Sequence, residues 1–406
     1  MNTKEEGFVS TVSFSFFKSL LKNACIRFLE KAIDNKAMAP SQINKSQIHR
    51  ILIVKAHDRA SDLILCTPVL RAVRQHFPDA HIAVLVKAGL TPLVQHSVYL
   101  DEIIPFNERI FGWSILKVLR FFRKLRSKFD LAMVLNTVSH SLLSDLLAYF
   151  SKARYVLGSE HLIFPYCKSN FFYNLIAPYA RFEKNQSERN LDIVRYLGVD
   201  HRDLSCEINL AKTHRNRALD FLIDQGMQHD KIAVAIHLGA RHEHPRWPVD
   251  KFVKVARHFS ENHNANIVVT WFADDAEFGL EFENGLPFKP ITVVGRPPIK
   301  LAAVFSFCHV FIGQDSEAMY LAAGVGTPSV VLFSKRDPAL WQPMGEEHQA
   351  LRMAKDSPNS LSDSLVIQAA ESLMKKFPRP QKLDVTDFDI SEQVLQDYLN
   401  TLNTFE

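Results

Sequence analysis

The chain has 406 residues, which is more than one compact core usually holds and suits two domains with an additional segment. With 47% hydrophobic and 23% charged residues its composition is that of a folded soluble protein, and no stretch approaches the roughly 20 uninterrupted apolar residues of a membrane-spanning helix. The net charge of +4 is small for this length, so composition gives no reason to expect a nucleic-acid partner.

The N-terminal segment predicts an amphipathic helix over residues 8–33, because apolar residues recur at close to helical spacing with lysines and arginines between them. Such a helix can pack on the body of the protein, or it can lie on anionic lipid headgroups. The sequence leaves both alternatives open. We assign residues 1–47 to this helical extension and to the polar linker after it, which contains Pro40.

From Arg50 onward, short apolar runs alternate with helical patterns, as in a parallel α/β sheet. In chain order, the prediction is a strand at 51–56, a helix at 63–77, a strand at 81–87, a basic aromatic helix at 113–128 and a strand at 131–136. Ligands of open α/β sheets bind along the carboxyl edge of the strands. The polar segment 136–141 is therefore expected at a binding edge.

A second α/β series follows a region rich in aromatic residues, 155–185, in which we expect loops before a helix at 187–198. The series consists of a strand at 231–240, a helix at 249–262, a strand at 266–273, and a strand from 311 that leads into a helix near Glu317. Two such series predict two Rossmann-like domains, over residues 48–208 and 209–358. Residues 359–406 are expected to form helices that pack back across the first domain.

The segment from Gly313 to Pro328 predicts an anion-binding site, because a strand runs through Asp315 and Ser316 directly into a helix. The free N–H groups and the dipole at a helix N-terminus favour a phosphate. Asp315 and Ser316 can bond ribose hydroxyls there, or they can simply cap the helix.

A second turn, HLGARHEHPRW, follows the strand that ends near Ile236 and offers several hydrogen-bond donors within ten residues. We expect a nucleotide diphosphate to contact this turn through four residues: His237, Gly239, Arg241 and Arg246. His242 and His244 lack further partners at a metal-binding spacing, so no metal site is predicted.

The loop KAHDRASD places Asp58 and Asp62 between the first strand and its helix, at the carboxyl edge of the first domain. A carboxylate in this position can remove a proton from a hydroxyl group that attacks a sugar. The alternative is that Asp62 only caps the helix.

Five cysteines are scattered without the paired spacing of a disulfide framework, and the N-terminus carries Glu5 and Glu6 in place of a basic signal-peptide region. They are Cys25, Cys66, Cys167, Cys206 and Cys308. We expect a reducing, cytoplasmic environment.

Three motifs together resemble glycosyltransferase family 9, the heptosyltransferases of lipopolysaccharide core synthesis. They are ILIVK with SDLILCTPVLRAVRQHFPDAHIAVLV, IHLGA with RWPVDKF, and GQDSEAMYLAAGVGTPSVVLF with DPALWQPMG. The resemblance covers residues from about 50 to 350, and its last motif is the most specific. The first-domain carboxylate Asp62 aligns with the proposed general base of the family.

The resemblance implies a GT-B fold, in which two Rossmann-like domains face a central cleft, with the N-terminal amphipathic helix as an extension. It further implies an inverting transfer without metal or cofactor, from an ADP-activated heptose to a lipid-linked acceptor, by an enzyme on the cytoplasmic side of the inner membrane. Donor contacts are then expected from the second domain, with Glu317 and Tyr320 added to the residues above, and acceptor contacts from Arg59, Asn136, Ser139 and His140. The N-terminal helix and residues 113–128 could both contact an anionic membrane, and the alternative for residues 113–128 is a solvated helix face.

The sequence differs from the family pattern at Ser61, Pro245, Glu317 and Tyr320. Glu317 stands where a glycine normally lets the backbone approach the donor, and Pro245 stands in place of a frequent lysine. Two alternatives therefore stay open: a glycosyltransferase with a different nucleotide sugar, or a relative that binds one without catalysis. Replacing Asp62 by Asn distinguishes these alternatives, because a catalyst should lose transfer while still binding the donor, whereas a binding protein should be unaffected.

Overall fold

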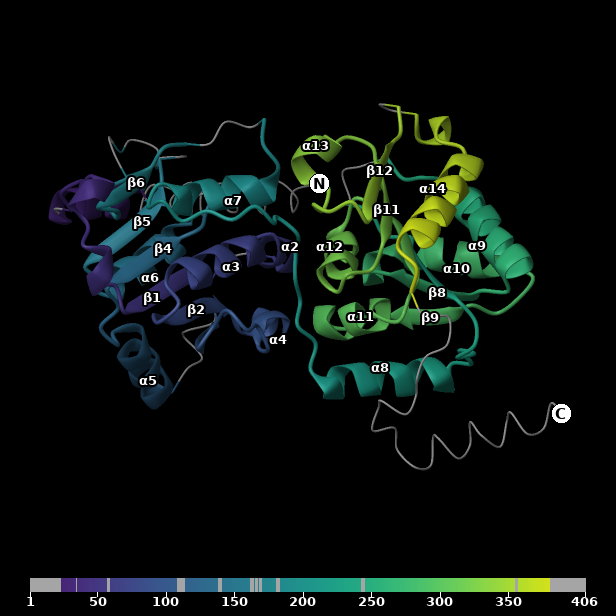
Figure 1. Ribbon diagram of the computed structural model, residues 1–406, viewed down its shortest axis with the longest axis horizontal. Helices are drawn as coiled ribbons and strands as arrows, with labels where there is room; N and C mark the ends of the chain where they lie inside the picture. The colour runs from purple at the N-terminus through teal and green to yellow at the C-terminus, as the bar shows by residue number, and fades with distance from the viewer. Residues whose placement is uncertain are drawn as a thin grey trace, which may run out of the picture.

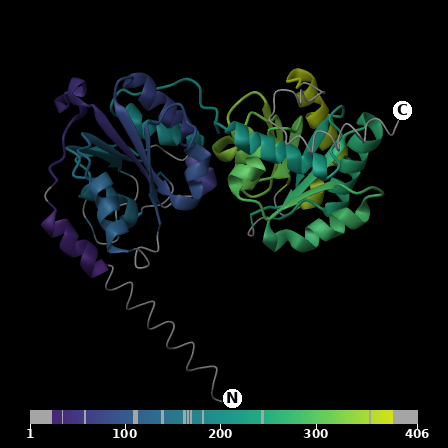
Figure 2. The ribbon, with the colours of Figure 1, turned by 90° about the horizontal axis from the view of Figure 1, so that it is seen from below.

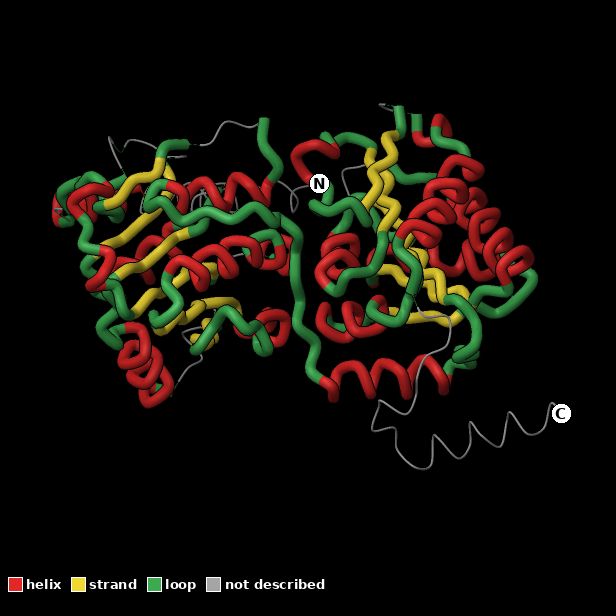
Figure 3. Tube along the Cα trace, in the orientation of Figure 1, coloured by secondary structure: helices red, strands yellow, loops and turns green. Residues whose placement is uncertain are grey.

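The computed structural model describes residues 23–33, 35–56, 59–107, 114–137, 141–160, 164, 167, 170–179, 183–241, 245–354 and 357–379. Two lobes lie side by side (Figures 1 and 2), each built on one parallel sheet with helices on both faces (Figure 3). Within the described ranges, every helix is too short or too polar to span a bilayer.

The first lobe has a six-stranded sheet in the order β3-β2-β1-β4-β5-β6, all parallel. Its strands are β1 (Arg50–Lys55), β2 (His81–Lys87), β3 (Glu102–Phe106), β4 (Leu131–Val134), β5 (Tyr155–Ser159) and β6 (Leu175–Ala177). Its helices are α2 (Ala60–Ile64), α3 (Thr67–His76), α4 (Thr91–Val94), α5 (Ile115–Leu125), α6 (Leu142–Phe150) and α7 (Gln186–Arg195). This strand order is that of a dinucleotide-binding fold.

The second lobe repeats the same topology, with the sheet order β12-β11-β10-β7-β8-β9. Its strands are β7 (Ala233–His237), β8 (Asn266–Trp271), β9 (Ile291–Val294), β10 (Val310–Gln314), β11 (Ser329–Phe333) and β12 (His348–Arg352). Its helices are α8 (Lys212–Asp224), α9 (Val249–His263), α10 (Ala276–Gly285), α11 (Pro298–Phe305), α12 (Glu317–Gly324), α13 (Pro338–Trp341) and α14 (Asp363–Lys376). The predicted GT-B architecture of two Rossmann-like domains is confirmed.

Two local predictions were wrong. The region 155–185 contains strands β5 and β6, where we expected loops. The predicted helix at 63–77 is two helices, since α3 starts afresh with Pro68 in its first turn, where proline needs no backbone donor.

The described part of the C-terminal segment lies elsewhere than expected, and residues 380–406 lie outside the described ranges. α14 packs on α9 and on β10, β11 and β12 of the second lobe, and not across the first domain. Its apolar side, which includes Val366, Ala370 and Leu373, is buried in the second lobe's core.

The N-terminal extension is described from residue 23, and residues 23–32 are helical. Ile26 and Ile33 are buried in the same apolar cluster as Phe121 of α5, whereas the Phe28 side chain is 70% exposed. The described part of this helix therefore packs on the first lobe. Residues 1–22 lie outside the described ranges.

The two lobes share a continuous hydrophobic core on the side of α3, α7, α11 and α12. The connecting segment is held to the second lobe by a hydrogen bond of 2.6 Å from the Ile208 N–H to the Gly324 carbonyl. Helices α2 and α12, one from each lobe, contact each other across the interface (Figure 1). The residues after β1 and β10 are thereby brought together.

Candidate active site

The carboxyl ends of three neighbouring strands, β7, β10 and β11, meet at one edge of the second sheet because the strands are parallel and in register. Each strand ends in a polar segment. His237 closes β7, Asp315 follows β10, and Arg336 comes three residues after β11. This edge faces the first lobe through α12.

His237 is fully buried, and its Nδ1 lies 2.7 Å from the hydroxyl oxygen of Thr270. Among the described residues, its Nε2 has no hydrogen-bond partner although it is enclosed. Burial, with the nearby charge of Arg246, lowers the pKa of His237 to about 3. The imidazole is therefore neutral near pH 7, and one ring nitrogen is available to a ligand.

Gly239 is required by the crowding at the end of β7. A Cβ atom at this position would lie 2.6 Å from His237 Nε2 and 2.7 Å from a carboxylate oxygen of Asp275. Real Cβ atoms do not approach other atoms so closely, so any other residue here would displace both side chains. The absence of a side chain therefore leaves the His237 ring and Asp275 in place.

Asp315 and Arg336 form the charged centre of the edge. An Arg336 guanidinium nitrogen lies 2.9 Å from Asp315 Oδ1, and Arg241 approaches the same oxygen at 3.8 Å. The Arg336 guanidinium also stacks on Trp341, 3.5 Å from the ring centroid. Two arginines beside one carboxylate leave net positive charge, which suits a diphosphate.

Arg336 was not among the predicted contacts, although it stands directly before the Asp337–Pro338 pair of the family motif. The side chain is nearly buried, and Asp62 of the first lobe is among the charges that act on it. Arg336 therefore lies within electrostatic reach of both the second-lobe edge and the candidate base.

Arg246 was predicted to bind phosphate, and the structure places it in an ion pair. One of its nitrogens lies 2.6 Å from Asp275 Oδ1, and its guanidinium lies 4.3 Å from the centroid of the Phe278 ring. The contact of Arg246 with a phosphate stays a prediction. Arg241 and Arg336 are closer to Asp315 than Arg246 is.

Ser316 and Tyr320 differ in how they can serve a ligand. Ser316 is the N-cap residue of α12, and its buried hydroxyl makes no capping bond and has no partner among the described residues. Tyr320 is fully buried, and its hydroxyl donates to the Trp341 carbonyl at 2.6 Å. Tyr320 thus holds α13 in place, whereas Ser316 keeps a free hydroxyl group.

Glu317, the first residue of α12, reaches across the interface to the first lobe. Burial raises the pKa of its carboxyl, and the negative charge of Asp62 acts in the same direction. Hydrogen bonds from the backbone N–H groups of Ser61 and Ala60 oppose this shift. Glu317 therefore connects the second-lobe edge to the start of α2.

Asp62 is the third residue of α2, and its Oδ2 accepts a hydrogen bond of 3.3 Å from the Arg59 backbone N–H. The capping role considered from the sequence is therefore present. The carboxylate also lies close enough to Glu317 and Arg336 for its charge to act on both. This location is compatible with proton transfer at the interface as well as with capping.

Of the predicted acceptor contacts, Asn136 and Arg59 are described. Asn136 follows β4 at the carboxyl edge, and its enclosed amide nitrogen has no hydrogen-bond partner among the described residues. Arg59 is exposed at the start of α2. The other predicted residues of this lobe lie outside the described ranges: Asp58, Ser139 and His140.

A polar network that the sequence did not reveal supports this edge of the first lobe. Thr137 bonds Asn190 at 3.0 Å, and Arg189 donates to the Thr137 carbonyl at 2.9 Å. Asn185 reaches the second lobe, where its amide donates to the Gln342 carbonyl at 3.0 Å. The network fixes the segment after β4 and links it to α13.

Comparison with known proteins relates this chain to one family. The family model described as glycosyltransferase family 9 (heptosyltransferase) matches residues 118–365. Lipopolysaccharide heptosyltransferase 3 of Escherichia coli K12 is 28% identical over 298 residues, which cover 70% of this chain and 83% of the relative.

Solved structures have the same fold. A glycosyl transferase family 9 protein from Veillonella parvula superposes with a TM-score of 0.68 at 21% identity, over 81% of this chain and 97% of that protein. The Escherichia coli heptosyltransferase WaaC with ADP gives a TM-score of 0.63 at 18% identity, over 80% and 99%.

Proposed function

The chain belongs to glycosyltransferase family 9, and on that premise we propose that it transfers a heptose from ADP-heptose to the lipid-linked inner core of lipopolysaccharide. One observation supports this most directly. The Asp315–Arg336 pair and the neutral His237 stand at one strand edge of the second lobe, and Asp62 of the first lobe lies within electrostatic reach of Arg336. In this proposal, a nucleotide-sugar site and a proton acceptor meet at the interface.

The proposed reaction is an inverting displacement without metal or cofactor. The acceptor hydroxyl oxygen forms a bond to the anomeric carbon, the bond from that carbon to the diphosphate oxygen breaks, and the hydroxyl proton passes to Asp62. Arg241 and Arg336 stabilise the negative charge that develops on the departing ADP. His237 and the free Ser316 hydroxyl offer hydrogen bonds to the nucleotide.

The donor assignment is tested by calorimetric titration with ADP-heptose and, in parallel, with other ADP sugars and with UDP and GDP sugars. We expect ADP-heptose to bind at least about tenfold more tightly than UDP or GDP sugars, a difference of about 1.4 kcal/mol. Preference for another nucleotide sugar would refute the heptose donor and support the different-donor alternative, which the Glu317 carboxylate beside the donor edge favours. Donor binding without transfer would support a non-catalytic relative.

The acceptor is proposed to be reached from the cytoplasmic surface of the inner membrane, through α5. Three of its apolar side chains are at least 60% exposed: Ile115, Leu116 and Leu119. Four basic residues of the same helix are exposed, and no acidic residue lies between Ser114 and Lys128. Lys117, Arg120 and Lys124 also line a surface cavity of about 340 Å³. Exposed apolar groups beside clustered positive charge fit an anionic lipid surface.

Introducing negative charge into this exposed face is expected to weaken membrane binding. The double variant Leu116→Asp/Leu119→Asp should bind vesicles of anionic lipid at least about tenfold more weakly, because two leucine side chains no longer enter the lipid. Cosedimentation with vesicles measures this, and transfer to a delipidated acceptor should be unchanged. Leu280→Asp is the matched control, because Leu280 is 59% exposed on the other lobe. Equal binding by the double variant and the control would rule out α5 as the membrane surface.

A further inference from the structure

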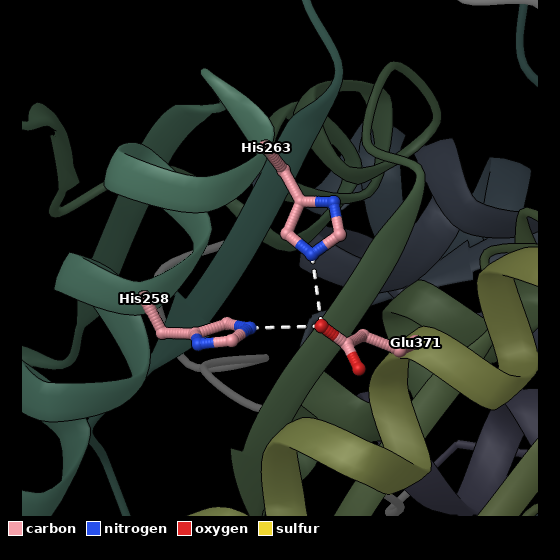
Figure 4. A group of neighbouring side chains, drawn as sticks. All are labelled: His258, His263 and Glu371. Atoms are coloured by element: carbon pink, nitrogen blue, oxygen red, sulfur yellow. Dashed lines mark hydrogen bonds and ion pairs between the residues drawn. The ribbon is translucent and has the colours of Figure 1, made fainter.

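Two histidines and one glutamate converge on the outer surface of the second lobe, where α9 packs against α14 (Figure 4). His258 Nε2 and His263 Nε2 each lie 2.8 Å from the same carboxylate oxygen, Oε1 of Glu371. All three potential ligand atoms lie within 4.8 Å of one another. The side chains are one-quarter to two-fifths exposed, so the cluster is accessible from solvent.

The local fold explains why these side chains meet. His263 is the last residue of α9, and Asn264 then turns the chain with a positive φ of 49°. Residues five apart do not share one face of a regular helix, but the end of α9 brings the His263 ring to within 5.6 Å of the His258 ring, centroid to centroid. Glu371 is presented by α14, which packs on α9 along this side.

A further contact orients one of the two rings. The other ring nitrogen of His258, Nδ1, lies 2.9 Å from the amide nitrogen of Asn262. An amide can present either its nitrogen or, after a flip, its oxygen. The flipped amide would accept the Nδ1 proton and leave the Nε2 lone pair directed toward Glu371, which is how outer groups orient histidine ligands of metals.

We propose that His258, His263 and Glu371 bind a divalent cation of the zinc class, with water as the fourth ligand. Ligands about 2.0–2.2 Å from a tetrahedral zinc ion are about 3.3 Å apart, so the two 2.8 Å contacts need to widen by only about half an ångström. Two imidazoles with one carboxylate favour zinc and its transition-metal neighbours over magnesium or calcium, which prefer oxygen ligands.

The site would act as a structural clip and not in sugar transfer. α9 starts beside the donor edge, near Trp247, and ends at His263 just before β8 begins at Asn266. The cluster is therefore near the amino ends of the strands, opposite to Asp315. A bound ion would join α14 to α9, and α14 packs on β10 and β11, whose carboxyl ends carry the proposed donor-binding residues.

The test uses the full chain after treatment with a chelator. Titration with zinc chloride is expected to show one ion bound per chain and a rise in Tm, because an ion that binds only the folded state stabilises it. Cobalt(II) at the same site should give the strong visible absorption of four-coordinate cobalt. Glu371→Gln and His263→Gln should each weaken zinc binding at least about tenfold, because each removes one of three ligands.

The matched control is Glu261→Gln, which removes an exposed carboxylate of α9 that pairs with Arg257 and not with the cluster. It should bind zinc as the unchanged protein does. The Tm of each metal-free variant, compared with that of the unchanged protein, verifies that the second lobe is folded. Zinc affinity that is equal in His263→Gln, Glu371→Gln and the control, or the absence of stoichiometric binding to the unchanged chain, would overturn the proposal.

Discussion

Asp62→Asn is expected to lower kcat for sugar transfer by about 10²–10⁴-fold, because an amide cannot take the proton of the acceptor hydroxyl. Asp62 is the described carboxylate at the start of α2, and it already faces Glu317 and Arg336 of the other lobe. Steady-state kinetics with purified donor and acceptor measure the loss. Donor affinity should change little, since the proposed proton transfer occurs after the donor has bound.

The asparagine substitution also separates catalysis from capping. Its side-chain oxygen can still accept the 3.3 Å hydrogen bond from the Arg59 N–H, so only the interaction of the negative charge with the helix dipole, about 0.3–1 kcal/mol, is lost. The free energy of unfolding of Asp62→Asn should therefore be nearly unchanged. Asp62→Ala, in contrast, should lose both transfer activity and some stability. If Asp62→Asn transfers heptose at the original rate, the carboxylate is only a cap and the proton acceptor is another group.

Arg336→Met is expected to lower kcat for transfer by about 10²–10³-fold, because it removes a cation that stabilises the negative charge developing on the departing diphosphate. The guanidinium is nearly buried, stacked on Trp341 and 2.9 Å from Asp315, so its charge acts in surroundings with little water to screen it. Weaker ADP binding, measured calorimetrically, should accompany the loss of rate.

Two further variants distinguish this role from simple neutralisation of Asp315. In Asp315→Asn/Arg336→Met the buried carboxylate that would lose its 2.9 Å partner is also removed, so stability should recover while transfer stays low. Arg352→Met is the surface control, because Arg352 is 58% exposed and lies 4.0 Å from Asp337. Recovery of transfer in the double variant would mean that Arg336 serves only to pair Asp315.

The strands at 50–55, 81–87 and 233–237 could be predicted because their apolar residues are nearly all buried between two layers of helices, which gives continuous hydrophobic runs. β5 and β6 were missed for a local reason. β6 has only three residues, and Gly158 of β5 lies against the ring of Tyr173, so aromatic residues fill the space that a longer apolar pattern would occupy. Short strands in aromatic surroundings show no clear hydrophobic periodicity, so the sequence pattern does not reveal them.

The candidate site was predictable only in part, for a similar reason. His237 and Asp315 stand at the ends of their strands, and Asp62 stands in the first turn of the helix after β1, where the sequence pattern is informative. The position of Arg336 at the site depends on β11 lying beside β10, and this pairing cannot be read from the sequence. The environments of Arg246 and Tyr320 depend on groups more than 20 residues away in the chain: the Asp275 carboxylate for Arg246 and the Trp341 backbone carbonyl for Tyr320.

The uncharged state of His237 makes the protein sensitive to acid. An unfolded histidine takes up a proton near pH 6.5, whereas the folded His237 has its pKa lowered to about 3. Its contribution to the free energy of unfolding is present above pH 6.5 and falls by about 1.4 kcal/mol per pH unit as the pH drops from 6.5 toward 3. Part of any loss of transfer as the pH drops below 6.5 would therefore come from proton uptake by unfolding chains.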